Sequence, residues 1–488
     1  MRRHIHHAIA IIATLTTLTG GLLASTGTPA EAATAGPAAT RYADDFNGDG
    51  YHDLAIGAPD ASVNVKGTDG ATTSVYAAGY VTVSYGGKYG AQKTGLKVIT
   101  QNSPGIPGDA KASRQFGAVL TNGDFNGDGY ADLAVGTRDD QVTLIWGSAT
   151  GLKGATAMAD PQKRPGYGVV LKSGDFTGDG RTDLVVGYST SLWLFRGPFK
   201  ADGSPLSTKK IELGRDYPVF GPQDAQNRIA VGRINKGAID DLVVLGERSN
   251  FGMGDAMRGR VLLGGTSGPR FTPVTIRGGG SVAIADFDKD GYGDIAVGDS
   301  AIQNDTDRAA GLVRINFGSV NGVDDSRGVQ TFNEDSDGIP GGVEAGDYFG
   351  NSVAAADLNQ DGNPELIIGA LGERKSTCEH CYISGGGFYV LKGTAKGVTG
   401  IGASWYAHNA PGLPTPAGTY RIPTLLKVTD LNNDKQPEIT FAVAATVPQV
   451  WSVGTKDGKV AGTSPTRVVN PPTDAQIGNG LLFGVLAR

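Results

Sequence analysis

Carboxylate and amide side chains recur along this chain with one spacing, and that spacing could hold a metal ion. The first copy, Asp45-Phe-Asn-Gly-Asp-Gly-Tyr-His-Asp53, places oxygen-bearing side chains at positions 1, 3, 5 and 9. Calcium prefers six to eight hard oxygen ligands, many of them carboxylates on a flexible loop. Gly50 at position 6 permits the positive φ of a tight turn, and position 7 can supply its backbone carbonyl. We therefore interpret this loop as a calcium site.

Five further copies follow along the chain and differ in quality. Thr177 stands at position 3 of one copy and is a weaker ligand than a carboxylate, and Lys435 takes the place of the glycine in the last copy. A carboxylate fills position 9 of every copy, at the start of the next strand. The predicted ligands, with position 7 contributing only a backbone carbonyl, are Asp45, Asn47, Asp49, Tyr51, Asp53; Asp124, Asn126, Asp128, Tyr130, Asp132; Asp175, Thr177, Asp179, Arg181, Asp183; Asp286, Asp288, Asp290, Tyr292, Asp294; Asp357, Asn359, Asp361, Asn363, Glu365; and Asp430, Asn432, Asp434, Gln436, Glu438.

A seventh copy has lost its ligand set. It runs from Arg233 to Asp241, with Arg233 and Gly237 in place of two acids, so we expect no metal there. Solvated Asp-Gly turns without metal are the alternative interpretation of any single loop. Six copies in register favour metal binding, and we expect five to six Ca²⁺ sites.

Strands rather than helices must position these loops. Each loop runs directly into a short apolar segment such as Leu54-Ala-Ile-Gly57, and no helical pattern flanks it. A strand–loop–strand setting therefore fits better than the helix–loop–helix of an EF-hand. Phe116, Tyr167 and Phe349, each followed by glycine, lie eight residues before the first Asp of a loop. An alternating strand and then a more polar strand follow the loop.

Repetition of this unit predicts the architecture. Four strands per unit and seven units, counting the degenerate copy, indicate an all-β fold: a seven-bladed β-propeller of four-stranded blades over residues 33–488. The first unit lacks a Phe-Gly strand, and Leu482-Phe-Gly-Val-Leu-Ala-Arg488 supplies one at the far end. We expect this C-terminal strand to join the first blade as its innermost strand and to close the ring, leaving no open edge.

The repeat resembles the FG-GAP repeat of the integrin α-chain head and of many secreted bacterial proteins. Asp49-Gly-Tyr-His-Asp-Leu-Ala-Ile-Gly-Ala-Pro59 carries the resemblance, and Asp347-Tyr-Phe-Gly350 comes close to it. The resemblance implies Ca²⁺ in the hairpin between the first two strands of a blade, and ligand contacts on the opposite face. That face collects the inter-blade linkers, including the similar segments Asn102–Gly108 and Asp335–Gly341. Loops on a rigid scaffold are where binding usually occurs.

The N-terminal residues predict export. A charged start and an apolar stretch over residues 8–24 precede Ala30-Glu-Ala32, which fits a small-residue cleavage site. We interpret residues 1–32 as a secretory signal peptide and expect a secreted, extracellular protein. A membrane anchor is the alternative, but the apolar stretch is short and diluted by threonines.

Charge and cysteine content narrow the functional classes. The formal net charge is −6, which argues against a nucleic-acid partner. Much of this acidity lies in the six loops and is assigned to metal binding. In an oxidising compartment Cys378 and Cys381 favour a small disulfide. His380 between them keeps a metal site as the alternative.

Motifs of established enzymes are missing from the chain. Gly-x-Ser-x-Gly, His-Glu-x-x-His and a phosphate-binding loop are all absent, and we assign no catalytic residue. We predict a monomeric binding or adhesion module for an extracellular protein or glycan, with no nucleic-acid partner and no membrane insertion. A lectin and a carbohydrate-active or other hydrolytic propeller are the alternatives, since the separation of acid pairs cannot be read from a sequence.

Overall fold

The computed structural model describes residues 44–92, 95–138, 141–158, 160, 167–214, 228–246, 258–301, 309–373, 385–407, 410–413, 420–422, 426–445, 449–462 and 466–469. The chain divides into Met1–Ala38 and Ala39–Arg488, and all described residues belong to the second unit. The signal peptide, the Cys378–Cys381 disulfide and the closing strand Leu482–Arg488 are predictions that lie outside these ranges. Within them, no helix is long and apolar enough to cross a bilayer.

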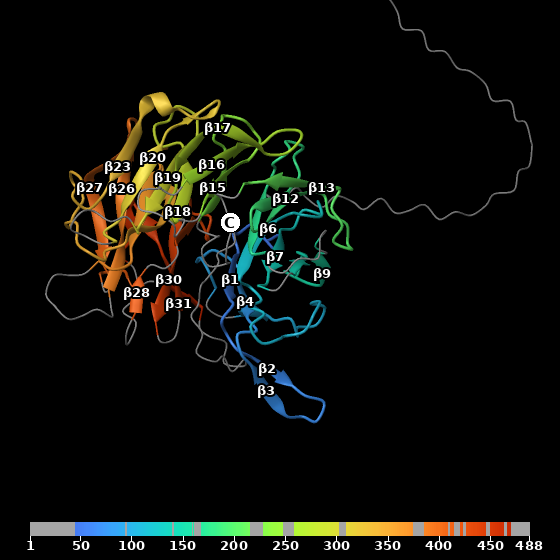
Figure 1. Cartoon of the computed structure of the whole chain (residues 1–488). Helices are drawn as coiled ribbons and strands as arrows, with labels where there is room; N and C mark the ends of the chain where they lie inside the picture. The colour runs from blue at the N-terminus through green and yellow to red at the C-terminus, as the bar shows by residue number, and fades with distance from the viewer. Residues whose placement is uncertain are drawn as a thin grey trace, which may run out of the picture. The chain divides into compact units, whose positions relative to one another are not determined.

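Seven blades of antiparallel strands follow one another along the chain, which confirms the predicted propeller (Figure 1). In each blade, strands that are consecutive along the meander pair with each other. Blades two to seven show four strands each: β6 (Val119–Gly123), β7 (Asp132–Gly136), β8 (Val142–Ile145), β9 (Ala155–Met158); β10 (Val170–Gly174), β11 (Asp183–Tyr188), β12 (Ser191–Arg196), β13 (Ser207–Glu212); β14 (Ile229–Gly232), β15 (Asp241–Leu245), β16 (Arg258–Leu263), β17 (Arg270–Arg277); β18 (Ser281–Ala285), β19 (Asp294–Asp299), β20 (Leu312–Asn316), β23 (Val329–Phe332); β24 (Phe349–Ala356), β25 (Glu365–Ala370), β26 (Gly385–Thr394), β27 (Gly397–Ala407); and β29 (Leu426–Thr429), β30 (Glu438–Ala445), β31 (Gln449–Val453), β34 (Thr466–Val469).

Blade one shows three strands in the described part of the chain: β1 (Leu54–Ala58), β4 (Tyr80–Ser84) and β5 (Lys97–Ile99). These correspond to the second, third and fourth strands of the other blades, because β1 directly follows the first acidic loop. The innermost position is the one assigned above to the C-terminal strand, and that assignment stays a prediction.

Several short elements are inserted between the strands of the blades. The hairpin of β2 (Val63–Lys66) and β3 (Thr72–Val75) projects from the lower face in Figure 1, between the second and third strands of blade one. The acidic loops lie at the other end of the blades, because they join first strands to second strands. The remaining elements are β21 (Gly318–Ser319), β22 (Gly322–Val323), the 3₁₀ helix η1 (Asp325–Arg327), β28 (Tyr420–Ile422), β32 (Thr455–Lys456) and β33 (Lys459–Val460).

Burial explains why the strands of a blade differ in sequence. The second strands are covered on both sides by neighbouring blades, so β7 and β15 are buried at every position. The outermost strand has one free side and an open edge, and five of the six residues of β13 are exposed. The predicted order, from apolar inner strands to a polar fourth strand, is confirmed.

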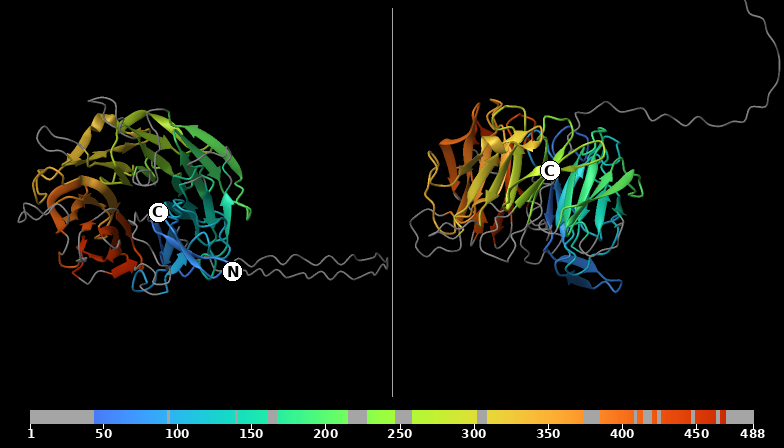
Figure 2. Two further views of the ribbon diagram at one scale, coloured as in Figure 1. Left: turned by 60° about the horizontal axis from the view of Figure 1, so that its bottom comes forward. Right: turned by 45° about the horizontal axis from the view of Figure 1, so that its top comes forward.

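The hydrophobic core is divided among the seven blade interfaces. One apolar cluster lies between each pair of neighbouring blades. The interface of blades seven and one packs Leu54 and Ile56 of β1 against Leu431, Ala442 and Val450. The last blade, in red, therefore lies beside the first, in blue (Figure 2). Packing of side chains thus closes the ring.

Paired glycines allow neighbouring blades to approach closely. Gly57 at the end of one blade's second strand faces Gly117, and a Cβ added to Gly57 would lie 1.9 Å from the Gly117 carbonyl oxygen. Gly136 faces Gly168 in the same way, with 2.3 Å to the carbonyl oxygen. Gly117 also has a φ of 88°, which favours glycine. The glycine of the Phe-Gly pair and the glycine after the acidic loop therefore meet across each of these two interfaces.

Candidate metal centres

The first carboxylate of each acidic loop organises the loop around itself. Asp45 Oδ1 accepts hydrogen bonds from the amides of Gly48 (2.7 Å) and Asp49 (3.2 Å), and Oδ2 accepts one from Gly50 (2.9 Å). Asp124 makes the same three bonds. The amides turn the chain around the carboxylate and bring positions 3 and 5 to the same side, as the spacing predicts.

The acid at position 9 joins the loop to the third strand of its blade. Asp53 accepts the Phe46 amide at 2.8 Å and the Gly86 amide, beyond the third strand, at 2.8 Å. Asp132 and Asp294 make the same pair of bonds. These residues are almost fully buried, so position 9 has a structural role in addition to the predicted ligand role.

The loops are also fixed to neighbouring blades, a contact that the spacing of the acids does not predict. The Asp45 and Phe46 carbonyls accept the amides of Ala131 (3.0 Å) and Ser148 (3.2 Å) of blade two. An apolar residue at position 2 of every copy is the sequence feature that could have indicated this contact. All seven side chains are completely buried: Phe46, Phe125, Phe176, Ile234, Phe287, Leu358 and Leu431.

Oxygens converge most clearly in the Asp286 loop. One carboxylate oxygen from each of Asp286, Asp288 and Asp294 lies within 4.8 Å of the other two. Asp286 Oδ1 is buried and has no hydrogen-bond partner. Burial raises the pKa of Asp294 to about 7, and the charge of Asp288 adds to this increase. Clustered carboxylates with an unsatisfied buried oxygen fit a hard divalent cation such as Ca²⁺.

The remaining loops have similar electrostatics. Burial raises the pKa of Asp53 and of Asp132 to about 8, and the other carboxylates of each loop act in the same direction. Burial also raises the pKa of Glu365 and Glu438 to about 7. A bound cation would favour the ionised form of each of these acids.

Arginine side chains approach two of the loops. Arg327, at the end of η1, donates to Asp288 and, at 3.1 Å, to Asp290 Oδ2. Arg196 donates to Asp179 Oδ2 at 3.1 Å. These pairs are partly exposed, and no spacing in the sequence indicates them. The two loops thus carry an internal positive charge beside predicted calcium ligands.

The two atypical copies fold like the others. Lys435 adopts a φ of 68° in place of glycine, and its amide donates to Asp430 Oδ2 at 2.8 Å. The degenerate copy keeps the bonds of position 9, because Asp241 accepts the amides of Ile234 and Gly264, both at 2.8 Å. The loop fold therefore does not depend on a complete ligand set.

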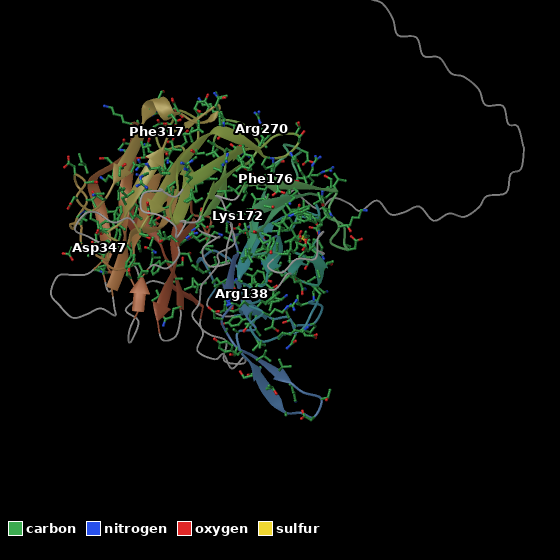
Figure 3. The ribbon with its side chains drawn as sticks, viewed as in Figure 1. Arg138, Lys172, Phe176, Arg270, Phe317 and Asp347 are labelled. Atoms are coloured by element: carbon green, nitrogen blue, oxygen red, sulfur yellow. The ribbon has the colours of Figure 1, made fainter. Side chains whose placement is uncertain are left out.

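A second acidic group lies on the other face and was not predicted. Glu334 follows β23, Asp347 precedes β24, and Glu373 follows β25. One carboxylate oxygen of each lies within 4.8 Å of the other two, and we call this group the acidic triad. Figure 3 shows Asp347 well below Phe317, which follows β20 near the acidic-loop end of blade five. The triad therefore lies away from the predicted metal loops.

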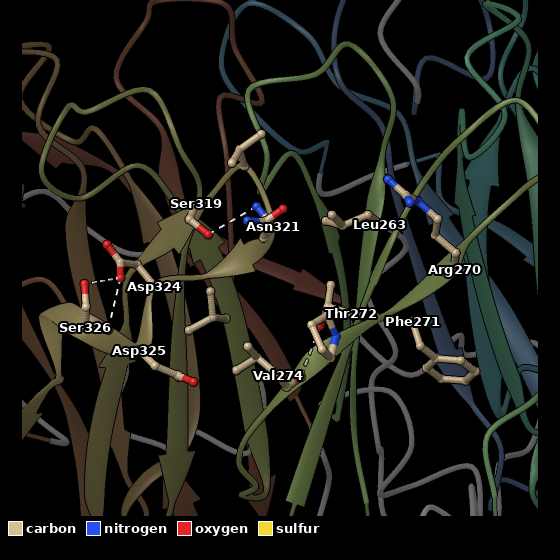
Figure 4. Close-up of a pocket in the computed structure, with 13 residues that line it drawn as sticks. Leu263, Arg270, Phe271, Thr272, Val274, Ser319, Asn321, Asp324, Asp325 and Ser326 are labelled. Atoms are coloured by element: carbon tan, nitrogen blue, oxygen red, sulfur yellow. Dashed lines mark hydrogen bonds between the residues drawn. The ribbon is translucent and has the colours of Figure 1, made fainter.

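A groove of about 600 Å³ runs between β17 and the β21–β22 hairpin with η1 (Figure 4). Phe271 and Val320 are exposed on its walls. Asp324 lies at its rim but already accepts the amide and the hydroxyl of Ser326, at 3.0 and 2.5 Å. None of its residues was a predicted site residue. It lies beside the acidic-loop face of blades four and five.

The blades and loops together define a class of protein, the seven-bladed β-propeller built from strand–loop–strand repeats with acidic loops. Three segments of the chain match the models of a known repeat family. The FG-GAP repeat model matches residues 43–84 and 349–382, and the FG-GAP-like repeat model matches residues 124–186. The chain therefore contains FG-GAP repeats, as the sequence resemblance predicts.

Relatives of known identity match only a part of the chain. The mouse phosphatidylinositol-glycan-specific phospholipase D is 32% identical over 154 residues, which are 29% of this chain and 17% of that protein. The bovine protein of the same name is 28% identical over 167 residues, which are 33% of this chain and 18% of that protein. The matched region thus spans less than a fifth of the length of these relatives.

Two solved structures show a distant likeness to this chain. AofleA from Arthrobotrys oligospora has 12% identity and a TM-score of 0.36, over 76% of this chain and 94% of that one. The dihydro-heme d1 dehydrogenase NirN has 12% identity and a TM-score of 0.40, over 92% of this chain and 79% of that one. At these scores neither likeness carries a functional argument.

Proposed function

We propose that this protein is a secreted, calcium-stabilised propeller that binds an extracellular protein or glycan. The observation that carries the metal part is the Asp286 loop, where one oxygen from each of three carboxylates lies within 4.8 Å of the other two and Asp286 Oδ1 accepts no hydrogen bond. Asp286, Asp288, Asp290 and Asp294, with the Tyr292 carbonyl, would hold the ion there. The equivalent residues of the other intact loops would do the same, giving five to six sites.

Calcium in these loops would stabilise the ring rather than contact the ligand. The loops already hydrogen-bond to the third strand of their own blade and to the next blade, so an ion at their centre would hold three chain segments together. Because calcium would bind the folded state, it would raise stability by about 2.7 kcal/mol per site at a hundredfold excess over Kd.

Ligand binding is proposed for the opposite face. The β2–β3 hairpin projects from that face, and residues 67–74 of the hairpin are exposed. Tyr76, next to β3, is 69% exposed and could stack on a sugar or a protein side chain. A rigid ring that presents loops of different length is a suitable scaffold for recognition.

Two measurements test the proposal. Elemental analysis of the purified chain should find several bound Ca²⁺, and chelation should lower the melting temperature, with recovery on adding Ca²⁺. A melt that does not respond to chelator, together with no bound calcium, would refute the metal part. The degenerate copy provides the control, because Asn235→Ala should not change the calcium content.

The ligand is tested with glycan arrays and extracellular protein panels, with and without calcium. Tyr76→Ala should weaken binding of any glycan or protein that is captured. Tyr89→Ala is the matched control, because Tyr89 is 88% exposed but lies in the loop after the third strand of blade one, at the acidic-loop end. If only Tyr89→Ala weakens binding, the proposed binding face is wrong.

A hydrolase is the second candidate, supported by the name of the matched relatives. Those relatives are called phospholipase D, but the match covers less than a fifth of their length. Incubation of the calcium-loaded chain with glycosylphosphatidylinositol substrates and polysaccharides tests this candidate. Turnover that is lost in Glu334→Gln but kept in Asp288→Asn would favour it over a pure binding module.

A further inference from the structure

Two members of the acidic triad, Glu334 and Asp347, lie in a linker whose fold does not require acids. The linkers 100–117 and 333–350 join blade one to two and blade five to six, and they share their backbone bonds. The amides of Ser103 and Ser336 donate to the carbonyls of Thr100 and Asn333, at 3.0 and 3.1 Å. The Ser103 and Ser336 hydroxyls in turn accept the amides of the same two residues, both at 2.9 Å.

Side chains at corresponding positions of the two linkers differ in charge. Glu334 corresponds to Gln101, and Asp347 corresponds to Arg114. At the first junction Arg114 donates to the side chain of Gln141 at 2.6 Å, and no acidic triad is formed there from described residues. The first linker adopts the same fold with a neutral and a basic residue at these positions. The fold of the linker therefore does not account for the presence of acids at the second junction.

Glu334 has one carboxylate oxygen that is buried and accepts no hydrogen bond. It is 2% exposed, its Oε1 accepts the Tyr389 hydroxyl at 2.8 Å, and its Oε2 has no hydrogen-bond partner. Asp347 is 3% exposed and accepts the Glu344 amide at 2.6 Å. Burying an ionised carboxylate beside two others is costly unless a proton or a cation neutralises the group.

We propose that Glu334, Asp347 and Glu373 bind a divalent cation of the hard, oxygen-coordinated class, Ca²⁺ in the first instance, at the junction of blades five and six. Three carboxylates supply the charge that such an ion needs, and the Tyr389 hydroxyl orients Glu334. Glu373 is half-buried and offers the route from solvent. The ion would join the outer strand of blade five to the inner strand of blade six, on the face opposite the acidic loops.

Protonation is the alternative to a cation for neutralising the charge of these three acids. Burial and then the neighbouring charges raise the pKa of Glu334 and of Glu373, and burial raises the pKa of Asp347. Without a cation the triad is therefore a proton-sharing cluster. Binding of the ion would release these protons, because a carboxylate must be ionised to act as a ligand.

Calcium stoichiometry of the full chain tests the proposal. After dialysis at saturating free Ca²⁺, the variant Glu334→Gln/Asp347→Asn should hold one ion fewer per chain than the wild type. The matched control Asp286→Asn/Asp288→Asn should lose one ion independently. An unchanged calcium content in a folded triad variant overturns the proposal and leaves the proton-sharing cluster.

A milder variant covers the case in which the buried double variant does not fold. Glu373→Gln removes one half-buried ligand and should weaken Ca²⁺ binding at one site by at least about 10-fold. Unchanged calcium titrations of this variant also overturn the proposal. If the acidic loops bind no calcium at all, the wild type should carry a single ion that is lost only in the triad variant. That result would separate failure of the loop sites from failure of the triad.

Discussion

Gly57 and Gly117 face each other across the interface of blades one and two, with no room for a Cβ atom at Gly57. The two glycines of the FG-GAP motif are therefore in contact with each other, although they belong to consecutive repeats. One glycine follows the acidic loop and the other follows the aromatic residue of the next blade. The separation of the blades is set at this contact, and the apolar clusters fill the rest of each interface.

Substitution of Gly57 should therefore be severe. The Cβ of Gly57→Ala would lie 1.9 Å from a backbone oxygen, so the blades must separate, and we expect a loss of more than about 3 kcal/mol of unfolding free energy. Gly87→Ala is the control, because its nearest neighbour is a side-chain atom 3.6 Å away. Urea unfolding measures both, and equal midpoints would contradict the close-contact interpretation.

Asp241 should stabilise the protein without any metal. It accepts two buried amides in the degenerate loop, so Asp241→Ala leaves two donors unsatisfied at a cost of about 2–5 kcal/mol. The loss should be the same with calcium and with chelator. Arg233→Ala, at a side chain that is 63% exposed, should have little effect. A loss that appears only with calcium present would show that this loop binds metal after all.

Arg327 should compete with calcium for the Asp286 loop. Its guanidinium donates to Asp288 and Asp290, so Arg327→Gln should strengthen calcium binding at this one site. Calcium titration followed by calorimetry can detect the change. Arg270→Gln, in the nearby groove, is the control and should leave the titration unchanged. Weaker binding in Arg327→Gln would mean that the arginine orients the ligands.

Stability of the chelated protein should fall as the pH rises. Burial raises the pKa of Asp53 and of Asp132 to about 8 from 3.8, so the folded state holds protons that the unfolded state has lost. The loss should extend from about pH 4 to about pH 8 and level off above that range. With calcium present the acids are ionised in the folded state and the decline should be smaller. Denaturant midpoints from pH 4 to 9 measure this, and stability that rises in chelator would contradict the assignment.

The fold and the acidic loops could be predicted from the sequence because their information is local. Asp45 to Asp53 contains every predicted ligand of the first site within nine residues, and six such copies together with the degenerate one define seven blades. The buried position 2, occupied by Phe46 in the first copy, was also readable as an apolar residue in every loop. The number of blades can be counted from the repeats in the sequence, because each blade is built from consecutive strands.

The acidic triad could not be predicted, because its members come from separate elements. Glu334 follows the last strand of one blade, whereas Asp347 precedes the first strand of the next blade and Glu373 follows its second strand. No spacing relates such residues until the blades are packed. Arg327 is similar, since it reaches Asp288 only through η1, an insertion between the third and fourth strands of blade five.

The packing of the last blade on the first also has a consequence for biosynthesis. Leu54 and Ile56 are made early, whereas the first of their partners, Leu431, is made about 375 residues later, and Ala442 and Val450 follow it. At ribosomal rates of about 5–20 residues per second, this apolar surface waits for its partners for roughly 20–75 s. Until then the nascent chain is an incomplete ring whose first blade exposes an apolar surface. A chaperone that covers Leu54 and Ile56 would prevent two such incomplete rings from associating.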